Sequence, residues 1–168
     1  MDAMDSAIDP LDIFARLCAA TLAGMVLGLD RDLRGKPTGM RTLGLVGLGA
    51  ALVSVATVNL DIIHGDAEAM SRVIQGIIPG VLTGIGFVGA GAVLRNHKAG
   101  EVEGLTTAAT VWVTATLGIP CGLSQWPIVL MGIGLTLTLL ALGRPLERLV
   151  SRVSGRKERA NEATQQQD

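Results

Sequence analysis

Long stretches without a charged residue constrain this chain more than any other feature of its sequence. No Asp, Glu, Lys or Arg occurs in residues 42–60, 73–94 or 104–143. A helix needs about 20 predominantly apolar residues to cross the hydrocarbon core of a bilayer. The first two runs therefore each predict one membrane-spanning helix, and the third is long enough for two.

A break divides the third run. Residues 120–122, Pro-Cys-Gly, are followed by Trp-Pro at 126–127, which predicts a short turn with an interfacial Trp. A further span is predicted over residues 11–29, where Arg16 pairs with Asp12 and reaches the membrane interface. We therefore expect an all-α polytopic membrane protein, a bundle of about five transmembrane helices.

The positions of the lysines and arginines predict the orientation. Of the 14 such residues, 12 follow the first, third or fifth span. They are Arg31, Arg34, Lys36, Arg41, Arg95, Lys98, Arg144, Arg148, Arg152, Arg156, Lys157 and Arg159. Because cytoplasmic loops are enriched in these residues, we expect the N-terminus outside and the C-terminus in the cytoplasm. The expected division is an acidic extracytoplasmic segment at 1–10, a transmembrane domain at 11–145 and a polar cytoplasmic tail at 146–168.

The composition agrees with a membrane protein. The chain has 22 Gly, only two Trp and two Phe, and no Tyr, and its net charge of -1 argues against nucleic acid as a partner. Small residues let helices approach closely in a bilayer, where no hydrophobic force draws helices together. Cys18 and Cys121 lie among apolar residues and are interpreted as buried free thiols.

Glycines are concentrated in the third predicted span. Gly84-Ile-Gly86-Phe-Val-Gly89 matches the dinucleotide-binding pattern, but that pattern requires a preceding strand in a soluble unit, and here it lies inside an apolar span. We interpret these glycines, with Gly91, as packing positions, and expect this helix to be the central packing element, kinked near Gln75 by Pro79.

The connection between the first two spans carries the densest charge in the chain. Asp30 and Arg34 have helical i,i+4 spacing, Gly35 fits a helix C-cap, and Pro37 prevents continuation. One interpretation is a salt-bridged turn whose cations only set topology. The other is a tight loop at a helix mouth, able to hold a phosphate, a carboxylate or an acidic patch. The candidate residues are Asp30, Arg31, Asp32, Gly35, Lys36, Gly39, Arg41 and Thr42.

The fourth predicted span begins with a threonine-rich turn. Thr107, Thr110 and Thr114 fall on one helical face, as hydroxyls that either bond to their own helix or form a polar seam between helices. The helix expected over residues 106–119 is about 21 Å long, which is short for a crossing. Short segments point to a site at membrane depth.

Metal and catalytic chemistry find little support in the sequence. The acidic residues lie outside the centres of the spans, which argues against a proton relay or an intramembrane cation site. Nothing resembles a nucleophile triad, a Walker loop or a paired catalytic acid and base, so we expect neither an enzyme nor a cofactor. Mg²⁺ stays open as a ligand or a signal.

Three ordered motifs together resemble the MgtC/SapB family of bacterial inner-membrane proteins. They are the loop from Asp30-Arg31-Asp32 to Arg41-Thr42, the segment Gly84-Ile-Gly86-Phe-Val-Gly89-Ala-Gly91, and Gly104-Leu105-Thr106-Thr107-Ala-Ala-Thr-Val-Trp112. The resemblance covers about residues 11–145. This chain departs from it with Asp for Glu at 30 and 32, with Leu43 where the family often has a polar residue, and without the soluble C-terminal domain that many members carry.

The resemblance implies a multi-pass inner-membrane protein that supports growth at low Mg²⁺ and, in pathogens, survival in macrophages. We expect a modulator of another membrane complex such as the F-type ATP synthase, with a Mg²⁺ transporter or accessory subunit, or a structural oligomer, as alternatives. The expected partners are lipid, such a complex and a second copy of the chain. A second set of candidate residues serves packing and the family motif: Gly84, Gly86, Gly89, Gly91, Arg95, Gly104, Leu105, Thr106, Thr107 and Trp112.

Overall fold

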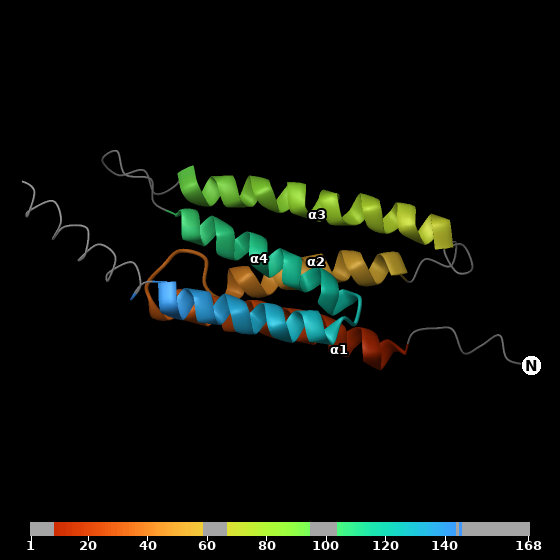
Figure 1. Ribbon diagram of the computed structural model, residues 1–168, viewed down its shortest axis with the longest axis horizontal. Helices are drawn as coiled ribbons and strands as arrows, with labels where there is room; N and C mark the ends of the chain where they lie inside the picture. The colour runs from red at the N-terminus through yellow and green to blue at the C-terminus, as the bar shows by residue number, and fades with distance from the viewer. Residues whose placement is uncertain (1–8, 59–66, 95–103, 144, 146–168) are drawn as a thin grey trace, which may run out of the picture. The chain divides into compact units, whose positions relative to one another are not determined.

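Five helices form the part of the chain that the computed structural model describes, which is residues 9–58, 67–94, 104–143 and 145. They are α1 (Pro10–Leu33), α2 (Met40–Val58), α3 (Ala67–Leu94), α4 (Leu105–Gly122) and a fifth helix, Trp126–Gly143 (Figure 1). No strand occurs in these ranges. All five are long and apolar enough to cross a membrane, which confirms the predicted all-α membrane fold.

Local capping sets the ends of α1. The Asp9 carboxylate accepts a hydrogen bond from the Leu11 amide at 3.0 Å, and Pro10 opens the helix. At the other end Gly35 adopts a left-handed φ of 59°, and its amide donates to the Asp32 carbonyl at 3.0 Å. The expected C-cap at Gly35 is therefore confirmed.

The break between α4 and the fifth helix lies slightly later than the sequence suggested. Pro120 is inside the last turn of α4, which runs on to Gly122, and the turn occupies residues 123–125. The Gln125 amide donates to the Pro120 carbonyl at 2.8 Å and closes this turn. α4 therefore has 18 residues and is about 27 Å long, so the expectation of a short helix was wrong. Neither proline ends its helix, since α4 continues through Pro120 and α3 continues through Pro79.

The core is formed by α1, α2 and α4, each of which packs against the other two. Over the most apolar stretch of 18 residues in each helix, 56% are buried in α4 and 6% in α3. Leu27 of α1, Leu43 of α2 and Val111 of α4 are fully buried. α3 packs mainly on α4 and only lightly on α2, and it lies at the edge of this group (Figure 1). The expectation that α3 is the central packing element was wrong.

Glycines explain why α1, α2 and α4 come so close. A Cβ on Gly24 would overlap the backbone of Leu43, and a Cβ on Gly118 would lie 2.5 Å from the Gly47 carbonyl oxygen. A Cβ on Gly122 would lie 2.8 Å from the Ala51 carbonyl oxygen. The three backbones thus touch at positions where only glycine fits.

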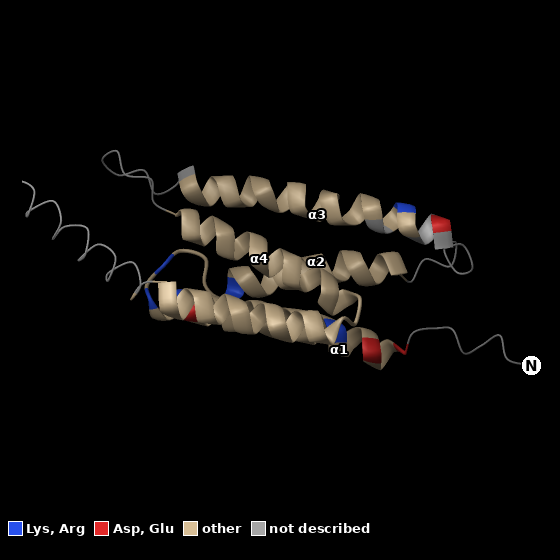
Figure 2. Ribbon diagram, viewed as in Figure 1, with Lys and Arg blue, Asp and Glu red and all other residues tan. Residues whose placement is uncertain are grey.

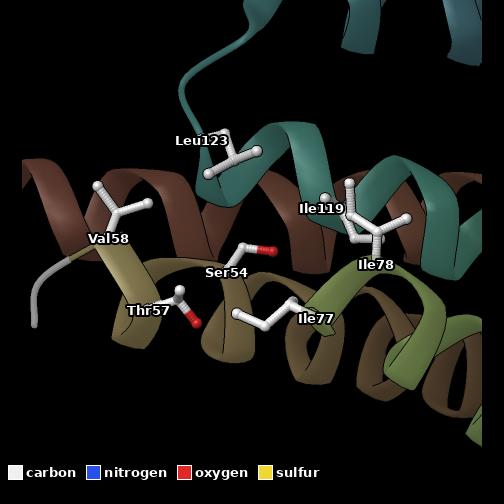
Figure 3. A pocket seen from close by; sticks show the side chains of 7 residues that line it. All are labelled: Ser54, Thr57, Val58, Ile77, Ile78, Ile119 and Leu123. Atoms are coloured by element: carbon white, nitrogen blue, oxygen red, sulfur yellow. The ribbon is translucent and has the colours of Figure 1, made fainter. Parts of the chain in front are cut away.

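A shallow groove lies between α2, α3 and α4 (Figure 3). Its lining is mostly aliphatic. The two hydroxyls that face it donate to their own helix, Ser54 to the Ala50 carbonyl at 2.9 Å and Thr57 to the Val53 carbonyl at 2.7 Å. The groove therefore offers an apolar surface. Its lining residues are Ser54, Thr57, Val58, Ile77, Ile78, Ile119 and Leu123.

The chain separates into two compact units, Met1–Ile133 and Gly134–Asp168. All of α1 to α4 and the site described below belong to the first. In the second, the described residues continue the fifth helix to Gly143, with the Thr138 hydroxyl donating to the Gly134 carbonyl at 2.7 Å. The predicted polar tail at 146–168 lies outside the described residues.

Candidate functional site

Charged residues gather at helix ends and leave the helix centres apolar (Figure 2). The end of α1, the connection to α2 and the first residues of α2 carry the densest group, which we call the charged mouth. The start of α4 lies at the same end of the bundle because Thr107 contacts α1 there. The charged mouth comprises Asp30, Arg31, Asp32, Arg34, Lys36 and Arg41.

Arg31 is the buried member of the charged mouth. The residue is only 4% exposed, and its Nη2 donates to the Thr107 Oγ1 of α4. Its backbone carbonyl accepts from the amides of Arg34 at 3.2 Å and Lys36 at 3.0 Å. A buried guanidinium needs hydrogen-bond partners, and the Thr107 hydroxyl of α4 supplies one of them, so this contact joins α1 to α4. Arg31 therefore fixes both the helix pair and the start of the loop.

Asp30 forms the pair that the sequence predicted. Its Oδ1 lies 2.8 Å from Nε and 2.5 Å from Nη2 of Arg34. Both side chains are partly exposed, and such i,i+4 pairs contribute about 0.3–0.5 kcal/mol. This pair supports the last turn of α1 and leaves the rest of the loop to other contacts.

Asp32 joins the end of α1 to the start of α2. Its Oδ2 accepts a hydrogen bond from the Met40 amide at 2.9 Å. The first amides of a helix have no partner within the helix, so a carboxylate oxygen there satisfies one of them. Gly39 lies directly against this carboxylate, and a Cβ on Gly39 would overlap it.

Lys36 and Arg41 lie on the surface of the charged mouth together with Thr42. Among the described side chains, neither cation forms an ion pair. The expected single network of Asp30, Arg31, Asp32, Lys36 and Arg41 is therefore not what these contacts show. Successive residues of a helix point in different directions, which separates the site into three local contacts and two exposed cations.

The second candidate set is only partly brought to this site. Gly104 precedes α4 with a φ of 94°, and a Cβ there would lie 2.8 Å from the Ala92 carbonyl oxygen. It therefore permits both the left-handed backbone and close approach to the end of α3. Leu105, Thr106 and Trp112 are exposed, and Arg95 lies outside the described residues.

The α3 glycines contact little of the described chain. A Cβ on Gly89 would meet Ala108 of α4 at 3.6 Å, an ordinary contact. A Cβ on Gly84, Gly86 or Gly91 would meet nothing within 4 Å. We expected these three glycines to hold α3 against the other helices, but within the described residues they do not contact α1, α2 or α4. Any functional role for them stays a prediction.

The buried threonines of α4 divide between the two interpretations of the sequence. The hydroxyls of Thr110 and Thr114 donate to the carbonyls four residues earlier, at 2.7 and 2.8 Å. Thr107 instead accepts the Arg31 guanidinium across the helix interface. The polar seam is therefore one contact at the charged mouth rather than a stripe through the bundle.

A second arginine of α1 binds the other end of α4. Arg16 pairs with Asp12, as the spacing predicted, and its Nη1 also donates to the Gly122 carbonyl at 3.1 Å. A cation at a helix C-terminus compensates the partial negative charge of the last carbonyls. The sequence showed the Asp12 pair but gave no signal for the contact with Gly122.

Sequence reasoning also missed the glycines of the core. Gly24 and Gly28 of α1 are four residues apart, as are Gly118 and Gly122 of α4. This spacing is typical of close helix contacts in membranes, and it was available in the sequence. The larger number of glycines in α3 had pointed to that helix instead.

No group of three or more His, Cys, Asp or Glu residues that could hold a metal occurs among the described residues. Asp2, Asp5, Asp61, Asp66, His64 and His97 lie outside them.

Comparisons with known proteins give a consistent family. Residues 17–149 match the MgtC family. The chain is 40% identical over 152 residues to Protein SrpB of Synechococcus elongatus, covering 84% of this chain and 80% of SrpB. It is 35% identical over 134 residues to the "Putative magnesium transporter YhiD" of Escherichia coli, covering 77% of this chain and 59% of YhiD.

Protein MgtC of Salmonella typhimurium is 36% identical over 110 residues, which cover 66% of this chain and 43% of MgtC. The match thus spans about half of YhiD and MgtC but most of SrpB. No solved structure matches significantly. With a family match over most of its length and five helices able to span a membrane, this chain belongs to the MgtC family of multi-pass membrane proteins.

Proposed function

We propose that this protein supports adaptation to low magnesium as a modulator of another membrane complex, with the F-type ATP synthase as the complex to test first. The charged mouth would be its contact site. The observation that carries the proposal is that two cations close together in the sequence are exposed at fixed backbone positions. Lys36 lies on the loop between α1 and α2, whose two ends are fixed, and Arg41 lies in the first turn of α2.

The fixation is what distinguishes this loop from a solvated turn. The Arg31 carbonyl binds the Lys36 amide, and the Asp32 carboxylate binds the Met40 amide, next to Arg41. The Arg31 side chain adds the anchor to α4. A preorganised pair of cations loses less conformational entropy on binding an acidic surface than flexible side chains do. The loop therefore fits a partner that presents carboxylates near the membrane.

Copurification from native membranes tests this proposal. A tagged form of the chain is isolated in mild detergent and probed for ATP synthase subunits by immunoblotting. We expect the wild type to retain the synthase and Lys36→Ala and Arg41→Ala each to reduce the retained amount by about tenfold, as rigid charge pairs do.

Arg72→Ala is the matched control. Arg72 is also an exposed cation at a helix end, but it pairs with Glu68 at 2.9 Å and lies outside the charged mouth. Its loss should leave retention unchanged. Equal losses in all three variants would point to general charge attraction, and unchanged retention in Lys36→Ala and Arg41→Ala would contradict the proposal.

A Mg²⁺ transporter is the second candidate, and the name of the relative YhiD favours it. It predicts Mg²⁺ uptake by liposomes that contain only this purified protein. Uptake above that of empty liposomes, lowered by Asp32→Ala at equal protein content, would favour transport over modulation.

A further inference from the structure

The geometry points to Asp32 as a positioning residue that acts as a hydrogen-bond acceptor whose charge is not required, with Gly39 leaving room for its carboxylate. This inference rests on the proposed function of the charged mouth and adds how its two exposed cations are held. Asp32 would contribute through one accepted hydrogen bond rather than through its charge or by binding a cation.

The carboxylate of Asp32 lies at the start of α2. Its Oδ2 lies 2.9 Å from the Met40 amide, at the first residue of α2, and Met40 follows Asp32 by eight positions in the sequence. The loop between them carries Lys36 and is followed by Arg41. One hydrogen bond thus closes a short loop across two helix ends, and its loss would release the second end of the loop.

Gly39 leaves the space that the Asp32 carboxylate occupies. Only Gly35 and Gly104 have a left-handed φ among the described glycines, so the backbone at residue 39 does not require glycine. The three atoms nearest to a Cβ built on Gly39 are all from the Asp32 carboxylate. Residue 39 is therefore glycine because the carboxylate occupies the space of a side chain, and Asp32 and Gly39 form one unit.

Asp32 differs in its contacts from Asp30, the other acid of the charged mouth. Asp30 is held by Arg34 within the same helix, whereas no described cation forms an ion pair with Asp32. An amide oxygen accepts the same hydrogen bond as a carboxylate oxygen, and Asn is as good an N-cap as Asp. Asn at this position should therefore keep the loop closed without a charge.

Hydrogen–deuterium exchange of the full chain in nanodiscs, followed by mass spectrometry at the Met40 amide, tests the inference. We expect Asp32→Ala to raise the exchange rate about fivefold, the usual cost of losing an N-cap acceptor. Asp32→Asn should exchange like the wild type, and so should the control Asp30→Asn. Exchange in Asp32→Asn equal to that in Asp32→Ala would overturn the inference.

The pairing with Gly39 gives a second readout. Gly39→Ala should displace the carboxylate and raise exchange as much as Asp32→Ala does. In the double variant the two effects should not add, because the Cβ then meets no carboxylate. A full additional increase in the double variant would show that Gly39 serves something other than Asp32, and would contradict the unit.

Copurification of the same variants keeps this inference distinct from the proposed function. If exchange follows the predicted pattern but retention of the ATP synthase does not change in Asp32→Ala, the cap stands and the proposed contact site fails. If Asp32→Asn exchanges like the wild type yet loses the synthase, the negative charge of Asp32 is needed for binding. The inference that this charge is not required then fails.

Discussion

α3 and α4 are both rich in small residues, yet they use them in opposite ways. In α4, Gly118 and Gly122 touch the backbone of α2, and over half of the helix is buried. In α3, Gly76, Gly80 and Gly84 repeat the same four-residue spacing, but a Cβ on any of them would meet nothing within 4 Å. Glycine spacing therefore shows that a helix can approach another closely, but not that it does so within the same chain.

The difference also explains where the charged mouth obtains its rigidity. It lies at the end of the tightly packed group α1, α2 and α4, and Arg31 joins two of these helices directly. Among the described residues, the contribution of α3 is the close approach of its end to Gly104. Substitutions in the two regions should therefore differ strongly in their effect on folding.

The largest expected effect is that of Gly24→Leu. The first added carbon would already overlap the backbone of Leu43, which cannot move without separating α1 from α2. We expect the free energy of unfolding to fall by more than about 3 kcal/mol. Equilibrium unfolding by SDS in mixed micelles measures it. A loss below about 1 kcal/mol would show that the two helices are not in contact at this position.

Leu43→Ala should come next. Leu43 of α2 is fully buried, so its truncation leaves a cavity and lowers the free energy of unfolding by about 3 kcal/mol. Phe87→Ala on α3 is the matched control, because Phe87 is 85% exposed and should change the same quantity by less than about 0.5 kcal/mol. Equal losses at the two positions would remove the distinction between the regions.

Thr107→Val should have a smaller effect. Valine has nearly the shape of threonine but cannot accept the hydrogen bond from Arg31, so only that contact is lost. Interhelical hydrogen bonds in membranes contribute about 1–2 kcal/mol. The same SDS titration should show a loss of that size, while Thr110→Val, whose hydroxyl bonds only its own helix, should lose less. A larger loss at Thr110 would contradict the assignment of Thr107 as the threonine of α4 that bonds to α1.

The smallest expected effect is that of Gly84→Ala. The added methyl group meets open space, and alanine favours helix, so the free energy of unfolding should change by less than about 0.5 kcal/mol. Pulse-chase measurement of abundance in cells extends the comparison. Normal unfolding in purified protein with reduced abundance in membranes would mean that this face of α3 packs against something other than α1, α2 and α4.

The sequence predicted the helices well because charge-free runs of membrane length have few alternative structures. The cap at Gly35 and the pairs Asp12–Arg16 and Asp30–Arg34 were also predictable, since they depend only on nearby residues. The length of α4 was not, because the prediction ended this helix at Pro120, whereas it runs on to Gly122.

The contacts between distant residues could not be read in the same way. The bonds from Arg31 to Thr107 and from Arg16 to Gly122 join residues far apart in sequence, and no local pattern identifies either partner. The same limit applies to the packing of α3. Its glycines have the spacing of a helix interface, but most of them contact no other helix among the described residues. The acceptor role of Asp32 became visible only when the position of the Met40 amide was known.

Coreconstitution of two purified components tests the central claim most directly. Liposomes that contain the F-type ATP synthase are prepared with wild-type protein, with Arg41→Ala or with Arg72→Ala, and ATP-driven acidification of the lumen is measured. A modulator that acts through the charged mouth should slow acidification in the wild type and in Arg72→Ala but not in Arg41→Ala. Equal acidification with and without the wild-type protein would contradict modulation of the synthase.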